Sequence, residues 1–81
     1  MLHAAALYYF REVARVGSIR KAASSMNVAA SALNRQIINL EIQLGTPLYD
    51  RLPGGMRLTV AGELLGRRAQ IALRRHDKTD P

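Results

Sequence analysis

The sequence contains no cysteine and no tryptophan, and only one phenylalanine. Without cysteine, a disulfide framework and a cysteine-ligated zinc site are both excluded. The chain also lacks any run near the roughly 20 apolar residues of a membrane span, and it does not begin with the charged and apolar segments of a secretion signal. We therefore expect a soluble, cytoplasmic protein.

Residue sets for catalysis or metal binding are missing as well. His3 and His76 are isolated, and neither has carboxylates at the spacing of a ligand set, so no metal or other cofactor is expected. No glycine-rich phosphate loop follows a predicted strand, and the context supports no Ser/His/Asp set. The sequence therefore predicts a protein that is not an enzyme.

Acidic residues are scarce: 6 Asp and Glu stand against 12 Lys and Arg, giving a net charge of +6. The surplus favours a polyanionic partner through attraction and counterion release, although it would equally provide solubility. Its distribution is more informative than its size. The basic residues gather early in the chain, beside a Gly-Gly turn, and in the last apolar-periodic segment: Arg11, Arg15, Arg20, Lys21, Arg51, Arg57, Arg67, Arg68, Arg74 and Arg75.

With 81 residues, of which 48% are hydrophobic, the chain can form one small domain with a modest core. Apolar residues at helical spacing predict helices over residues 3–16, 19–26, 30–44 and 60–75. Residues 48–58 instead indicate two short strands around a tight turn at Pro53-Gly54-Gly55.

Local signals define where these helices begin and end. Gly17 and Gly45 are predicted helix ends, because glycine adopts a positive φ without steric cost. Ser18 and Thr59 are predicted N-caps, whereas the residue before the third helix is Ala29, which has no side chain that could cap it.

The order of these elements, α-α-α-β-β-α, describes a mainly α winged helix-turn-helix with a C-terminal linker helix. A plain three-helix bundle would explain the helices but does not require a basic hairpin after them. We divide the chain into the winged helix-turn-helix (1–58), the linker helix (59–76) and a polar tail (77–81).

Leu7, Phe10 and three segments carry a resemblance to a known family: "GSIRKAA" (17–23), "SALNRQIINLEIQLGTPLYDR" (31–51) and "LTVAG" (58–62). Residues 7–62 resemble the N-terminal DNA-binding domain of the LysR-type transcriptional regulators. The resemblance implies that the third helix enters the major groove, the wing reaches the minor groove, and the fourth helix pairs two subunits. A C-terminal effector-binding domain normally follows, so a small-molecule effector is expected to act only through that domain, which these 81 residues lack.

Three positions depart from the family pattern. Ala29 stands where a capping Ser or Thr is usual, Ala30 where Gln is frequent, and Asn34 where Ser is frequent. The loss of Gln removes a reader of bases, whereas alanine can contact thymine methyl groups. We therefore expect the preferred DNA site to differ from those of close family patterns.

A helical wheel divides residues 30–44 into two faces. The inner face is predicted to hold Leu33, Ile37, Leu40 and Leu44. The opposite face holds Ser31, Arg35, Ile38, Asn39 and Ile42, with Asn34 on the flank. The first turns of a recognition helix reach base edges, so Ser31, Asn34 and Arg35 are the predicted readers. Arg35 suits either guanine or a phosphate, and both alternatives stay open.

The complete set of predicted DNA contacts is Ser18, Arg20, Lys21, Ala30, Ser31, Asn34, Arg35, Asn39, Arg51 and Arg57. Ser18 begins a helix beside two cations, a favourable place for a phosphate, although it would also serve as a plain cap. Arg51 and Arg57 flank the wing turn, where cations can enter a narrow minor groove. A solvated hairpin is the alternative.

The last helix carries an apolar stripe, part of which must cover the core. The rest fits a homodimer, with Ala61, Leu65, Ala69, Ala72 and Leu73 as predicted contacts. The sequence thus predicts sequence-specific binding of double-stranded DNA in transcriptional regulation, as a dimer. The alternatives are a winged-helix module for protein interactions and a basic amphipathic helix on an anionic membrane.

Overall fold

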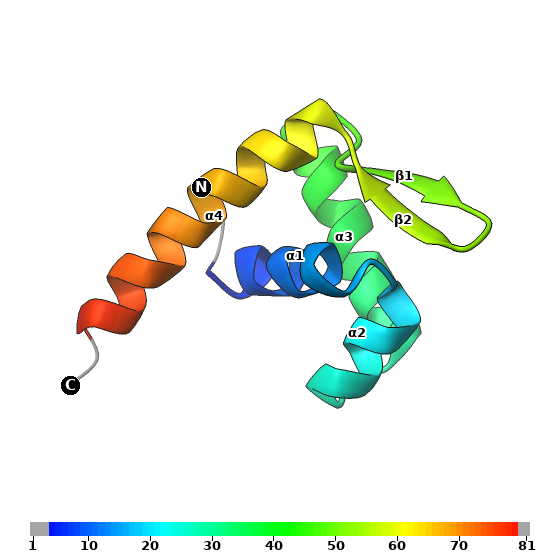
Figure 1. Ribbon diagram of the computed structural model, residues 1–81, viewed down its shortest axis with the longest axis horizontal. Coiled ribbons are helices and arrows are strands. Elements are labelled where there is room, and N and C mark those ends of the chain that lie inside the picture. The colour runs from blue at the N-terminus through cyan, green and yellow to red at the C-terminus, as the bar shows by residue number, and fades with distance from the viewer. Residues whose placement is uncertain (1–3, 80–81) are drawn as a thin grey trace.

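The computed structural model describes residues 4–79, with side chains described for residues 4–69. Its elements follow the predicted order: α1 (Ala4–Val16), α2 (Ile19–Met26), α3 (Ala30–Leu44), β1 (Tyr49–Leu52), β2 (Gly55–Leu58) and α4 (Val60–Thr79). In Figure 1, α1 lies across α3, the β1–β2 wing projects on one side, and α4 extends from the body on the other. The mainly helical winged helix-turn-helix is confirmed.

The predicted end of α1 and both ends of α2 are also confirmed, whereas residue 3, the predicted start of the first helix, lies outside the described residues. Gly17 adopts φ 76°, and its amide donates to the Val13 carbonyl oxygen at 2.8 Å. The Ser18 hydroxyl then accepts a hydrogen bond from the Lys21 amide at 3.2 Å, which caps α2. Asn27 ends α2 in the left-handed conformation with φ 59°, a region that asparagine tolerates better than most residues.

One core joins α1, α2, α3 and the start of the wing. Its buried members are Phe10, Val13, Ala22, Ala23, Leu33, Ile37, Leu40, Leu48 and Tyr49. The prediction was therefore right for three of the four inner-face residues of α3. It was wrong for Leu44, whose surface is 39% exposed. Leu44 is the last residue of α3, and Gly45 turns the chain away with φ 73° before another element covers this position.

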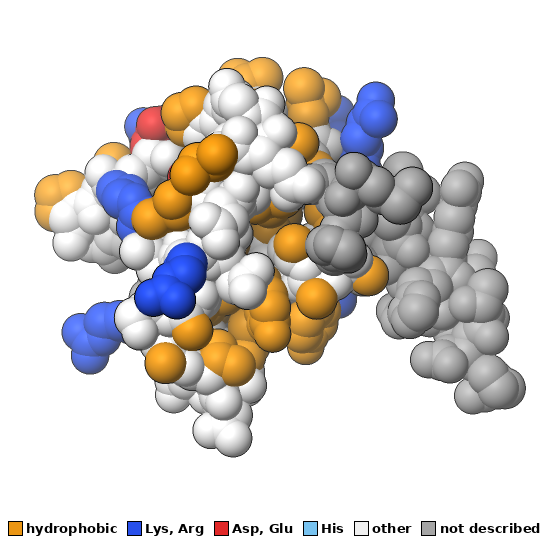
Figure 2. Space-filling model, turned by 180° about the vertical axis from the view of Figure 1, so that it is seen from behind, with side chains coloured by type: hydrophobic (Ala, Val, Ile, Leu, Met, Phe, Trp, Pro, Cys, Tyr) orange, Lys and Arg blue, Asp and Glu red, His pale blue; other side chains and the backbone are white. Residues whose placement is uncertain are grey.

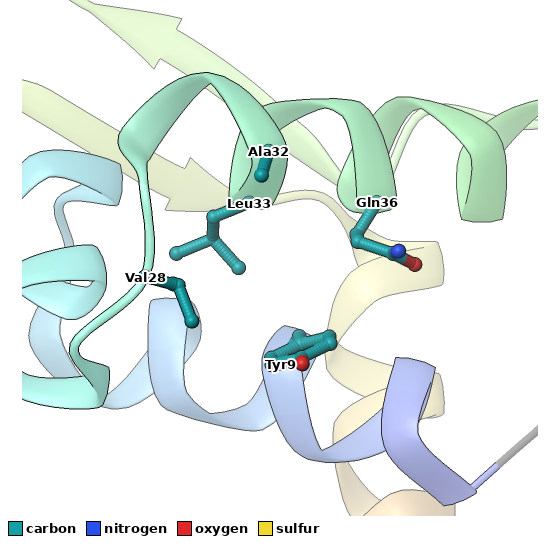
Figure 3. A pocket seen from close by; sticks show the side chains of 5 residues that line it. All are labelled: Tyr9, Val28, Ala32, Leu33 and Gln36. Atoms are coloured by element: carbon teal, nitrogen blue, oxygen red, sulfur yellow. The ribbon is translucent and has the colours of Figure 1, made fainter.

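The first turns of α3 pack against α1 around a small hollow. Tyr9 of α1, Val28 before α3, and Ala32, Leu33 and Gln36 of α3 line a space of about 70 Å³. Figure 3 shows Val28 and Leu33 reaching toward this space from one side, with Tyr9 opposite. Leu33 is nevertheless buried, so it anchors the beginning of α3 to α1.

The wing is a two-stranded antiparallel hairpin. Tyr49 pairs with Leu58 and Leu52 with Gly55, so Pro53 and Gly54 form the connecting turn. The wing also contacts the corner between α1 and α2, where the Met56 amide donates to the Gly17 carbonyl oxygen at 3.2 Å.

Two glycines, one at the start of β2 and one in the first turn of α4, permit close backbone approaches. A Cβ at Gly55, whose φ is 156°, would lie 2.6 Å from the Gly17 carbonyl oxygen. A Cβ at Gly62 would lie 2.2 Å from the Leu48 carbonyl oxygen. Gly55 therefore does more than shape the turn, because it lets the wing dock against the α1–α2 corner.

The N-cap of α4 is as predicted, but the helix is longer than predicted. The Thr59 hydroxyl accepts a hydrogen bond from the Gly62 amide at 3.0 Å. The helix continues to Thr79, beyond the predicted end at Arg75 and into the segment expected to be a tail. No glycine or proline lies between residues 67 and 79, so nothing in the sequence interrupts it. None of the described helices is both long and apolar enough to cross a membrane.

Candidate nucleic-acid interface

The outer face of α3, defined here as Ser31, Asn34, Arg35, Ile38, Asn39 and Ile42, turns away from the core. All of these residues are exposed except Asn34, which is half-buried. The helical period produces this division, because residues near 31, 35 and 38 lie opposite Leu33, Ile37 and Leu40. Ile42 is 73% exposed, so the apolar part of this face is uncovered in the chain itself.

The beginning of α3 has no side-chain cap, as predicted. Ala29 has extended backbone angles (φ −69°, ψ 138°) and offers no side-chain acceptor. Ala30, another predicted contact, is exposed beside it. The first amides of α3 therefore remain without a capping side chain, in an orientation that favours an anionic acceptor.

Two predicted contact residues from different elements meet where β1 lies beside α3. Arg51 Nη2, on β1, donates to Asn34 Oδ1, on α3, at 2.8 Å. The two were predicted as independent contacts, and the structure joins them. The bond links α3 directly to the wing.

The other wing arginine is held more loosely. Arg57 lies opposite Asp50 in the hairpin, and its Nη2 is 4.0 Å from Asp50 Oδ2. Both side chains are more than half exposed, so the pair contributes little to stability. Arg57 can therefore turn toward another anion at small cost.

The acidic residue of α3, Glu41, is engaged within the fold and was missed as a functional residue. Its Oε2 accepts hydrogen bonds from the Leu48 amide at 2.7 Å and the Tyr49 amide at 3.3 Å. This carboxylate fixes the start of β1 relative to α3. No short sequence pattern could have revealed it, because the partners lie seven and eight residues away, beyond the end of the helix.

Tyr49 fastens the same point of the wing to α1. Its hydroxyl donates to the Phe10 carbonyl oxygen at 2.6 Å, and its ring lies 5.4 Å from the Phe10 ring centroid. Burial, and secondarily the negative charge of Glu41, raises the pKa of Tyr49 well above its usual range. The phenol therefore remains a protonated donor.

Ser18, Arg20, Lys21 and Ser24 line an open hollow at the beginning of α2. Arg20 and Lys21 are exposed, whereas Ser18 is half-buried by its role as a cap. The hollow thus combines a helix N-terminus with two cations, as the sequence predicted.

Basic side chains are spread over more than one element of this surface. Figure 2, a view from behind, shows Lys and Arg projecting at several places on the half of the molecule that carries the wing and α2. Among the described residues, no three His, Cys, Asp or Glu side chains gather where they could hold a metal ion. His3 and His76 lie outside the described side chains.

The predicted dimer contacts on α4 divide into two groups. Ala69 is fully buried, and Ala61 and Leu65 pack against the core of the same chain. Ala72 and Leu73 lie outside the described side chains. On the outer side of α4, Val60 is 76% exposed and Leu64 is 56% exposed.

Comparison with known proteins adds a family to this geometry. Residues 4–63 match the model of the bacterial regulatory helix-turn-helix proteins of the lysR family. The chain is 37% identical over 70 residues to YybE of Bacillus subtilis (strain 168), named an uncharacterized HTH-type transcriptional regulator. That match covers 86% of this chain and 24% of YybE.

Two solved complexes with DNA share the fold. The BenM_DBD/catB site 1 DNA complex superposes with a TM-score of 0.92 at 32% identity, covering 96% of this chain and 88% of that one. The CbnR_DBD–DNA complex superposes with a TM-score of 0.91 at 31% identity, covering 96% of this chain and 90% of that one. This chain belongs to the lysR family of bacterial regulatory helix-turn-helix proteins.

Proposed function

We propose that this chain binds double-stranded DNA sequence-specifically in transcriptional regulation, with α3 in the major groove and the wing in the minor groove. The observation that carries the proposal is the outer face of α3: it exposes Ser31 and Arg35, while the carboxylate of Glu41 is bonded to the wing backbone. The two similar chains solved in complexes with DNA support the same assignment.

The roles follow from the chemistry of each side chain. Arg35 can bind guanine O6 and N7 bidentately, and Ser31 can bond to several base edges. Ala30 presents a methyl group that suits the methyl of thymine. Asn39 lies about two turns after Ser31 on the same face, where the major groove curves away from the helix. It is therefore placed nearer to the DNA backbone than to the bases.

Phosphate contacts come from separate elements around α3. Ser18, Arg20 and Lys21 surround the beginning of α2, where a helix N-terminus favours an anion. The uncapped amides after Ala29 form a second site of the same kind. Arg57 is free to turn toward the backbone or the minor groove, because its pair with Asp50 is long and exposed.

A homodimer on a two-part DNA site is the second half of the proposal. The buried positions of the α4 stripe serve the chain's own core, so the outer side that displays Val60 and Leu64 is the surface for a second α4. Two subunits would then present two α3 helices to successive major grooves, and the DNA site would contain two half-sites.

The deciding experiment is the selection of bound sequences from random duplex DNA. We expect a motif of two related halves, and a selected duplex that binds at least tenfold more tightly than a scrambled duplex of the same length and composition. Because both duplexes carry the same phosphates, this ratio removes the non-specific electrostatic contribution. Equal binding of the two duplexes would contradict sequence-specific recognition.

A further inference from the structure

The Asn34–Arg51 hydrogen bond determines the orientation of an amide on the proposed recognition surface. Arginine has only donors, so the Asn34 atom 2.8 Å from Arg51 Nη2 must be the carbonyl oxygen Oδ1. The orientation of the amide is thereby assigned by chemistry, and Nδ2 lies on the side away from this bond. The two side chains come from α3 and β1, seventeen residues apart.

This bond changes what Asn34 can offer a base. A free asparagine presents one donor and one acceptor side by side, the pattern that matches adenine N7 and N6. Here one acceptor position of Oδ1 is taken by Arg51, while both Nδ2 hydrogens remain to donate. Asn34 is therefore left with two donors and one acceptor position to offer a base, an excess of donors.

We propose that Asn34 and Arg51 read DNA as one unit, in which Arg51 is the positioning residue and the pair selects a base edge rich in acceptors. Guanine, with N7 and O6, is the base that best satisfies such a unit. This inference rests on the proposed function and adds to it a preference at one position. It also assigns Arg51 a role distinct from that of Arg57, whose guanidinium, among the described side chains, has only the long contact with Asp50.

The pair also couples two parts of the interface. A displacement of the wing would pull on the Asn34 amide, and a wrong base beneath Asn34 would disturb the wing. Coupled contacts of this kind give double-mutant effects that depart from additivity, whereas separated residues give nearly additive ones.

The test is a double-mutant cycle of the 81-residue chain with Asn34→Ala, Arg51→Ala and both changes together. Affinity is measured on the selected duplex and on variants carrying each of the four bases at every position of a half-site. We expect Asn34→Ala to relax a guanine preference at one position. Arg51→Ala should shift preference at that same position toward adenine, on the order of threefold to tenfold. In the double variant, the Arg51 change should have no further effect on preference there.

Arg57→Ala is the matched control, because it removes a second wing arginine that lacks a bond to α3. It should weaken binding to all duplexes alike and leave the preference at the Asn34 position unchanged. Circular dichroism melts of every variant check that folding is retained. Since both side chains of the pair reach solvent, we expect the melts to agree closely with that of the parent.

The inference would be overturned by additive effects of Asn34→Ala and Arg51→Ala at every position, or by a uniform loss of affinity with Arg51→Ala like that of Arg57→Ala. A parent preference for adenine at the Asn34 position that is indifferent to Arg51 would also overturn it. Failure of the parent to select any sequence would instead refute the proposed function, so the two failures are distinguishable.

Discussion

The two faces of α3 are made for different tasks. The inner face buries Leu33, Ile37 and Leu40 against the other helices. The outer face leaves Ser31 and Arg35 exposed, with no bond to another described side chain. Fifteen residues thus both complete the core and form the proposed DNA surface. The contrast teaches that stability and binding should respond to different substitutions in a single helix.

The largest effect is expected on the inner face. Leu33→Ala should lower the free energy of unfolding by about 2–5 kcal/mol, because it removes buried methyl groups beside an existing hollow. Urea denaturation followed by circular dichroism measures the loss. A change below about 0.5 kcal/mol would mean that α3 is not anchored to α1 at this position.

The same contrast can be sharpened on α4, where neighbouring leucines face different ways. Leu65→Asp should destabilise the chain by about 2 kcal/mol or more, because Leu65 packs against the core. Leu64→Asp should leave stability nearly unchanged, since that side chain is more than half exposed, but should weaken dimerisation about tenfold. Sedimentation over a concentration series measures the second effect. A parent that stays monomeric at high concentration would contradict the proposed dimer.

Tyr49 tests the connection between the inner core and the wing. Tyr49→Phe removes the hydrogen bond to the Phe10 carbonyl and should lower the free energy of unfolding by about 0.5–1.5 kcal/mol at neutral pH. The raised pKa of Tyr49 keeps the folded phenol protonated above pH 10, where the unfolded phenol ionises. The unfolded state then binds fewer protons, so the parent loses stability as pH rises there.

The difference in the free energy of unfolding between the parent and Tyr49→Phe should therefore become smaller as the pH rises above 10. Urea denaturation of both proteins in a pH series from 8 to 11 measures it. A constant difference over that series would show that this phenol titrates alike in the folded and unfolded chains.

A similarly small effect is expected at the uncapped beginning of α3, on the boundary between the two faces. Ala29→Ser supplies an acceptor for an amide two or three residues further on and should stabilise the chain by about 0.5–1.5 kcal/mol. Affinity for DNA should hold or rise slightly. Ser18→Ala, which removes the existing cap of α2, is the matched control and should destabilise by about 1 kcal/mol. A loss of stability with Ala29→Ser would show that a serine cannot cap α3 here.

Local patterns were sufficient to predict most of the fold. Helical periodicity located all four helices, and Gly17, Ser18, Gly45 and Thr59 marked their ends, because these signals act within one turn of the chain. The error at Leu44 has the same origin. A wheel predicts the direction of a side chain, but not whether another element is present to cover it.

Contacts between distant segments could not be predicted in this way. The bonds from Glu41 to the start of β1 and from Arg51 to Asn34 depend on how the wing is placed beside α3. The close approach of Gly62 to the Leu48 backbone depends instead on how the start of α4 packs beside the residue that precedes β1. The sequence identified Asn34 and Arg51 as separate candidates, and only the packed structure shows them as a pair.

The proposed binding of duplex DNA by the outer face of α3 is tested most directly by the affinity of the parent and of Arg35→Ala across a salt series. For the parent, log affinity should fall linearly with log salt, with a slope of about −0.9 per phosphate neutralised. Arg35→Ala should retain the parent's melting temperature. If Arg35 reads a base, the free energy of specific binding falls by about 1–3 kcal/mol and the preference at one base pair relaxes. If Arg35 holds a phosphate, the affinity for all duplexes falls alike and the salt slope becomes shallower by about 1. Salt-independent affinity, or affinity indifferent to Arg35, would contradict the account.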